Sequence, residues 1–373
     1  MSMTITMKTI PNSPLKYDRS FEVLEQDEAE TNAKLIHALR GIQQTVYEDS
    51  GHAERAVHAK SHGILRGQLR VAEGLPTPLA QGMFAKPGVY PVVMRFSTIP
   101  GDVLDDSISV PRGLAIKIVG VDGARLPGSE GDVTQDFVLV NGAAFGKPTA
   151  KSFATALNLA AATTDKAPRL KKALSAVLRG VEKIVEAFGG KSPTLISIGG
   201  QQETHLLGDT YYSQAPLLYG DYVVKVALAP VSSELADLAN TPLDLSGKPN
   251  GLRDAVVNYF RAHDGVWDLR VQFCTDLKTM PIEDASKVWP EEQSAYLSVA
   301  RPHVPAQHAW SDARASAIED GISFSPWHGL AAHRPLGSIM RVRKSAYEAA
   351  ARFRAERNQR AIVEPKNLDN FPD

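Results

Sequence analysis

Two β-rich regions on either side of a helical insertion constrain the fold of this chain more than any other feature. In residues 64–141 and 219–275, short runs rich in β-branched and aromatic residues alternate with clusters of Gly, Pro and Asp. This texture is typical of antiparallel strands joined by turns. Residues 149–188 between the two regions are rich in Ala and other helix formers. We expect the strands on both sides of this insertion to share one sheet. The predicted fold class is therefore α+β, with a closed antiparallel β-barrel of about eight strands and α-helices packed outside it.

The same pattern predicts a single domain over residues 1–373. No internal repeat, low-complexity tract or clean linker divides the sequence. An apolar stripe with helical spacing predicts a helix over 26–49, ahead of the first strand. The expected parts of the domain are an N-terminal arm at 1–20, a barrel over 55–275 that carries the helical insertion at 149–188, and a loop segment followed by a final helix within 281–360.

Composition excludes several classes of protein. The 373 residues carry a formal net charge of −1 and a single cysteine, Cys274. A balanced charge does not favour a nucleic-acid partner, and one cysteine permits neither an internal disulfide nor a Cys-rich zinc site. No apolar run approaches the roughly 20 residues that cross a membrane, and residues 1–20 lack the apolar stretch of a signal peptide. We therefore expect a cytoplasmic protein with no membrane span, and not a periplasmic one.

The predicted C-terminal helix over 338–360 carries one tyrosine between two arginines. Arg343, Tyr347 and Arg354 are spaced by four and seven residues, so they share a helix face. Alanines surround the tyrosine and would let a large flat group come close. One interpretation is a tyrosine packed on the core, with arginines that reach water. The other is a phenolate metal ligand, stabilised by the Arg343 guanidinium, with Arg354 placed to pair with a carboxylate of a cofactor.

A second polar segment, at 52–63, holds three histidines. A polar loop with scattered histidines explains it without any special chemistry. A zinc site would need several converging ligands, and only His58 and His62 have the spacing of neighbours on one helix face. The sequence has no HExxH motif, so a metalloprotease is not favoured.

Six segments in a fixed order along the chain resemble a known family. They are RAVHAKSHG (55–63), VVMRFST (92–98), PRGLAIKI (111–118), QDFVLVNGAAF (135–145), SKVWPEE (286–292) and RVRKSAY (341–347). In number and order they resemble the haem catalases and, more closely, the shorter catalase-related haem peroxidases. The chain departs from catalases at Ala351, where a histidine is usual, and by ending soon after the final helix.

This resemblance implies a haem enzyme with a complete set of site residues. Haem of the b type would be the cofactor, peroxide the substrate and a small molecule the reductant, in a homo-oligomer for which a dimer is favoured. On the distal side, His58 would be the acid–base residue, Ser97 its partner and Asn141 the amide that holds peroxide. The proximal iron ligand would be Tyr347, supported by Arg343. The remaining cofactor contacts would be Arg55, Val57, Arg95, Phe145 and Arg354.

Three functions remain open at this level. The first is reduction or dismutation of hydrogen peroxide or organic hydroperoxides. The second is isomerisation or cleavage of a fatty-acid hydroperoxide, as in enzymes of the allene-oxide-synthase type. The third is a non-enzymatic barrel that carries haem or lipid. The apolar Val57 beside the expected distal histidine favours ordinary peroxide chemistry.

Overall fold

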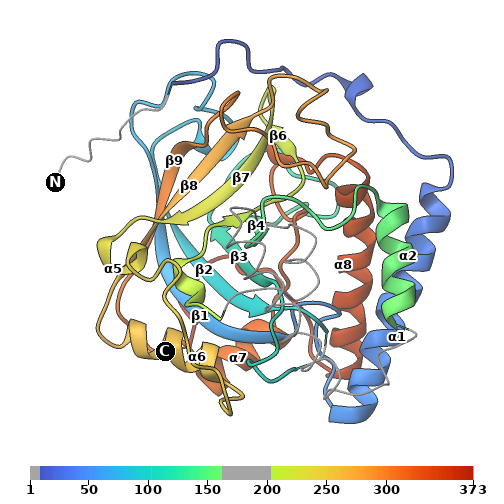
Figure 1. The fold of residues 1–373 in the computed structure, drawn as a ribbon, viewed down its shortest axis with the longest axis vertical. Coiled ribbons are helices and arrows are strands. Elements are labelled where there is room, and N and C mark those ends of the chain that lie inside the picture. Colours follow the sequence, from blue (N-terminus) through green and yellow to red (C-terminus); the bar gives the residue numbers. More distant parts are fainter. Residues whose placement is uncertain (1–8, 102, 162–202, 373) are drawn as a thin grey trace, which may run out of the picture.

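A single antiparallel sheet of nine strands lies at the centre of the computed structural model, which describes residues 9–101, 103–161 and 203–372 (Figure 1). The predicted insertion at 149–188 is described only as far as residue 161, and the rest of it lies outside the described residues. The strands are β1 (Lys60–Val71), β2 (Val89–Thr98), β3 (Arg112–Val119), β4 (Thr134–Val140), β5 (Tyr211–Tyr212), β6 (Leu217–Tyr219), β7 (Tyr222–Pro230), β8 (Gly265–Phe273) and β9 (Leu297–Val304).

The sheet closes on itself as a barrel. The strand order is β5-β4-β3-β2-β1-β9-β8-β7-β6, and β5 pairs with both β4 and β7. Because β6 joins only β7 among the named strands, the remaining eight form the closed ring. The predicted eight-stranded antiparallel barrel is thus confirmed, with strands from both β-rich regions in one sheet.

One strand of this ring was not expected. The segment 281–340 was predicted to be loop-rich, yet β9 lies within it and joins β1 to β8. The barrel therefore extends to residue 304 and does not end at 275. Pro302 faces Leu69 across this pairing. Proline within an apolar run indicates a loop or an edge strand, so the sequence pattern does not predict β9. The strand forms because it pairs with β1 and β8.

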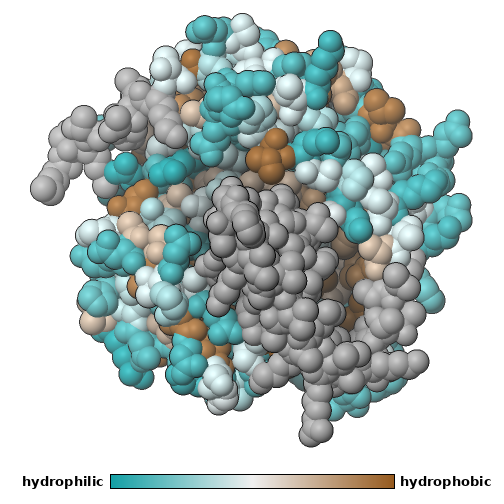
Figure 2. Space-filling view, viewed as in Figure 1, coloured by the Kyte–Doolittle hydropathy of each residue, from teal (hydrophilic) through white to brown (hydrophobic). Residues whose placement is uncertain are grey.

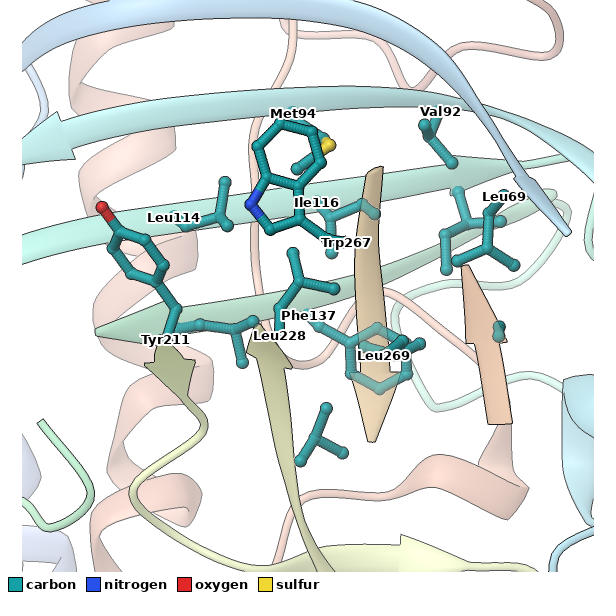
Figure 3. Close-up of a cluster of buried hydrophobic side chains, with 14 of the residues drawn as sticks. Leu69, Val92, Met94, Leu114, Ile116, Phe137, Tyr211, Leu228, Trp267 and Leu269 are labelled. Carbon is teal, nitrogen blue, oxygen red and sulfur yellow. The ribbon is translucent and has the colours of Figure 1, made fainter. Parts of the chain in front are cut away.

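The barrel interior is filled by large apolar side chains. Alternate residues of each strand point inward, as Val92 and Met94 of β2 do (Figure 3). Trp267 and Leu269 of β8 reach the same core from another strand and are completely buried. The intervening residues of β2, among them Arg95 and Ser97, point to the outer face of the barrel wall.

Three helices gather on one side of the barrel (Figure 1). They are α1 (Glu28–Ser50), α2 (Ala150–Ala161) and α8 (Ser338–Arg357). The predicted helices over 26–49 and 338–360 are confirmed as α1 and α8. The shorter helices are α5 (Ser233–Ala236), α6 (Gly251–Phe260) and α7 (Asp312–Ala315).

The surface has a mixed character. On the face in Figure 2, hydrophilic side chains predominate among the described residues, and hydrophobic ones form small separate groups. Within the described ranges, every helix is too short or too polar to cross a bilayer.

Candidate functional site

The proximal side of the candidate site is built on α8. Arg343 Nη2 donates a hydrogen bond of 2.6 Å to Tyr347 Oη, one helical turn away. The guanidinium carbon also lies 5.1 Å from the centre of the tyrosine ring. Ala346 of the same helix is buried against Leu39 of α1, with Ala350 beside it. The phenol is therefore bonded by a cation, and its neighbours along the helix are small residues.

The opposing side is built on the outer face of the barrel wall. His58 follows α1 and has a backbone φ of 55°, a left-handed conformation that is uncommon outside glycine. Its Nδ1 lies 3.2 Å from Ser97 Oγ of β2. Gly113 of β3 makes room for the ring, because a Cβ there would lie 2.6 Å from His58 Nδ1. The imidazole is thus clamped between a hydroxyl and a glycine of the wall.

The electrostatics of His58 keep it neutral. Burial lowers its pKa to about 3, and the positive charges of Arg95 and Arg343 act in the same direction. A neutral imidazole can accept a proton, which a protonated one cannot. The ring is therefore in its basic form throughout the physiological pH range.

Three arginines meet at another part of the site around a carboxylate that the sequence analysis missed. Glu319 accepts hydrogen bonds from Arg55 Nε at 2.6 Å and from Arg95 Nε at 2.7 Å. Arg354 Nη1 bonds to the main-chain oxygen of Glu319. Glu319 lies in a short Ile-Glu-Asp-Gly segment with no periodic or motif signal. Only the approach of β2, α8 and the 316–320 turn reveals it.

One cavity lies between Tyr347 of α8, the His58–Ser97 pair and the three arginines. Its walls come from α1, from the segment after α1, from β2, β3 and β4, and from α8. The lining side chains include Leu39, Arg55, Val57, His58, Arg95, Ser97, Ala115, Val138, Phe324, Ala346, Tyr347, Ala350, Ala351 and Arg354.

The architecture matches solved structures of catalases. No family model and no curated protein matches the sequence. A fungal catalase aligns with a TM-score of 0.58 at 17% identity, over 98% of this chain and 72% of that chain. A bacterial catalase aligns with a TM-score of 0.56 at 15% identity, over 95% and 67% of the two chains. Catalase A from Saccharomyces cerevisiae aligns with a TM-score of 0.57 at 17% identity, over 98% and 75%.

The chain has the catalase fold. Structural similarity at this level of sequence identity establishes the fold. The activity must be argued from the residues of the site. The resemblance of the six sequence segments to the catalase superfamily agrees with the fold. The closer likeness to the shorter catalase-related peroxidases stays a prediction.

Two expected residues lie elsewhere in this catalase fold. Asn141 accepts a hydrogen bond from the Arg112 main-chain N–H at 3.0 Å and donates one to Asp209 Oδ2 at 3.0 Å. Phe145 packs edge-on against Phe153, with ring centres 5.1 Å apart. Neither residue is among those that line the cavity. The distal role of Asn141 and the cofactor contact of Phe145 therefore rest on the sequence resemblance alone.

The cavity residues fit a haem group. A ferric haem takes an axial ligand such as a phenolate and presents two carboxylates that pair with arginines. Tyr347, backed by Arg343, offers the ligand, and the three arginines offer the cations. Ala346, Ala350 and Ala351 line the cavity with small apolar surfaces. Asn141 is the one expected distal group that this arrangement does not include.

A second cluster of metal-ligating side chains is filled by a lysine. Asp136, His328 and Glu364 bring possible ligand atoms within 4.8 Å of one another. Lys117 Nζ lies 2.8 and 2.9 Å from the two Asp136 carboxylate oxygens and also bonds Glu364. The buried ammonium group supplies the positive charge that these carboxylates need.

Proposed function

We propose that this chain is a haem-dependent enzyme that decomposes peroxides, of the catalase-related peroxidase type. The observation that carries this proposal is the joint lining of one cavity by Tyr347, whose hydroxyl accepts a hydrogen bond from Arg343, and by the His58–Ser97 pair. A carrier of haem or lipid would need neither a neutral base nor its hydroxyl partner. We also propose that residues 1–373 form one haem domain.

The proposed proximal ligand is Tyr347. Arg343 donates a hydrogen bond to the Tyr347 oxygen, and its guanidinium lies over the tyrosine ring. Arg55, Arg95 and Arg354 would bind the carboxylates of the cofactor, and Val57 would pack against it. Bound haem would supply the redox chemistry, while the protein supplies ligation, orientation and proton handling.

The proposed acid–base residue is His58. In the tautomer that carries its proton on Nδ1, His58 would donate to Ser97 Oγ, and the other ring nitrogen, Nε2, would be left as a proton acceptor. It would take a proton from one peroxide oxygen and return it to the departing oxygen as water forms, which is general acid–base catalysis. Dismutation of two hydrogen peroxide molecules yields two waters and one O₂, whereas peroxidase turnover requires a small-molecule reductant.

The test is reconstitution with haem followed by two parallel assays. We expect stoichiometric haem binding with a tyrosinate-type high-spin spectrum. Oxygen evolution from hydrogen peroxide and turnover of a bulky alkyl hydroperoxide are then compared, each scaled to haem content. Exclusive turnover of the alkyl substrate would move the assignment to the lipid-hydroperoxide class. Failure to bind haem, or haem binding without reaction toward either peroxide, would contradict the proposal.

A further inference from the structure

Glu319 is a buried anion at the centre of the arginine cluster. We propose that Glu319 is a positioning residue that holds Arg55 and Arg95 so that their remaining N–H groups, together with Arg354, receive two carboxylates of one ligand. This inference rests on the proposed haem-dependent function. Glu319 is indicated by no sequence motif, and its proposed role implies that the cavity binds a ligand with two negative charges.

Glu319 occupies one edge of each of two guanidinium groups. It accepts from the Nε atoms of Arg55 and Arg95, at 2.6 and 2.7 Å. Main-chain oxygens take the Nη2 atoms, with Ile318 O at 2.9 Å from Arg55 and His58 O at 2.8 Å from Arg95. Each arginine is thereby fixed at two of its three nitrogens, which defines its orientation.

These contacts leave other N–H groups of the three arginines open. Among the described residues, no hydrogen bond engages Nη1 of Arg55 or of Arg95, or Nε and Nη2 of Arg354. All three arginines line the cavity. These N–H groups are not among the fully buried atoms without a partner, so they are accessible from the cavity and suited to acceptors that a ligand brings.

The cluster carries more positive than negative charge. Three guanidinium groups and one carboxylate form the cluster, because Asp320 next door is bound by His52 and Asn358 instead. Glu319 pairs with both Arg55 and Arg95, so the three guanidinium groups and one carboxylate leave an excess of two positive charges, which two ligand carboxylates would balance. Burial raises the pKa of the nearby Glu54 carboxyl, which weakens its contribution as a further anion.

Glu319 itself remains ionised. Burial opposes its charge, but Arg95 and Arg55 outweigh burial and lower its pKa to about 2. A π-helical turn over Ser316–Asp320 directs both its side chain and its main-chain oxygen toward the cluster. Such turns occur frequently at functional sites. In the alternative role, Glu319 would occupy the place of a ligand carboxylate and would have to be displaced by it. Glu319→Gln would then bind haem more tightly, not more weakly.

The experiment compares haem with haem dimethyl ester, whose carboxylates are esterified and uncharged. Affinities are measured by absorbance titration of the apoprotein. We expect the wild-type protein to prefer haem. In Glu319→Gln, haem affinity should fall by about 10- to 100-fold, the range typical for residues that support a ligand from behind. Affinity for the ester should stay unchanged, so the preference between the two ligands shrinks.

The matched control is Asp320→Asn, which neutralises the adjacent carboxylate on the same turn and should leave both affinities unchanged. Tighter haem binding by Glu319→Gln would show that Glu319 competes with the ligand and would overturn the proposal. So would no change, or equal losses for both ligands. If Glu319→Gln does not fold, Glu319→Asp keeps the charge and should lose haem affinity alone, by less than 10-fold, and an equal loss with the ester would overturn the proposal.

The two levels of failure are distinguishable. A wild-type protein that binds neither ligand would contradict the haem function and this inference together. A wild-type protein that prefers haem, with a Glu319→Gln variant that keeps the full preference, would contradict only the role of Glu319.

Discussion

The inner face of the barrel wall packs the hydrophobic core, whereas the outer face lines the candidate site. On β2, Val92, Met94 and Phe96 point into a core that is filled by side chains, and all three are completely buried. Arg95 and Ser97, which alternate with them along the strand, face the cavity under α8. Because strand side chains alternate, one ten-residue strand both stabilises the barrel and presents the site. A change on one face should therefore affect stability, and a change on the other should affect ligand chemistry.

The largest effect is expected from His58→Ala on the outer face. Loss of a general acid–base group typically lowers the rate by about 100- to 10,000-fold. Haem should be retained, because the proposed iron ligand lies on α8. The measurement is the rate of the peroxide-dependent spectral change, scaled to haem content. Asn141→Ala is the comparison and should cost less, since its amide moves no proton and already bonds Asp209. A near-normal rate in His58→Ala would remove the proposed mechanism.

Trp267→Ala tests the inner face. This side chain is completely buried in the barrel core, and removal of a buried tryptophan typically lowers the free energy of unfolding by about 3–5 kcal/mol. Denaturant unfolding of the apoprotein measures the loss. In the protein that remains folded, the peroxide rate per haem should be close to that of the wild type. A selective loss of rate with unchanged stability would show that the two faces are not separable.

A smaller effect is expected from Tyr347→Phe, which removes one oxygen at the cavity. Loss of an outer-shell partner costs about 10- to 100-fold in metal affinity, so loss of the ligand itself should cost at least about 10-fold. Absorbance titration with haem measures the affinity and the change in spectrum. Tyr219→Phe is the control, because the Tyr219 hydroxyl bonds Leu79 O within the barrel. An unaltered haem spectrum in Tyr347→Phe would refute the proximal assignment.

The smallest effect is expected on the pH dependence of stability, and it tests the protonation state of His58. Its pKa is about 3 in the folded protein, below the ordinary 6.5, chiefly because of burial. As pH falls below about 6.5, the unfolded chain binds a proton that the folded chain does not, so stability decreases. The contribution of one group cannot exceed about 1.4 kcal/mol per pH unit. Unfolding of the apoprotein between about pH 7 and 5 should show a shallower loss in His58→Gln. Parallel slopes for the two proteins would mean that the folded protein does not hold the pKa of His58 below its ordinary value.

Much of this fold follows from local sequence patterns. The alternating runs predicted the barrel, and the four-residue spacing of Arg343 and Tyr347 placed both on one helix face, where the guanidinium bonds the phenol. These features are short in range, so a strand or helix period is enough to predict them. His58 and Ser97 were predicted only through resemblance, because 39 positions separate the two atoms that meet.

Other features depend on contacts that only the tertiary structure creates. Pro302 made β9 resemble a loop, yet β1 and β8 pair with it on both sides and close the barrel. Glu319 meets Arg55 from 264 positions away in the chain, and no local period connects them. Asn141 is engaged by Asp209 across 68 positions. The sequence by itself determined which elements form and which faces are apolar, since those depend on neighbouring residues. The tertiary structure decided which distant charges share a buried site, because their pairing depends on how the closed barrel, α8 and the 316–320 turn come together.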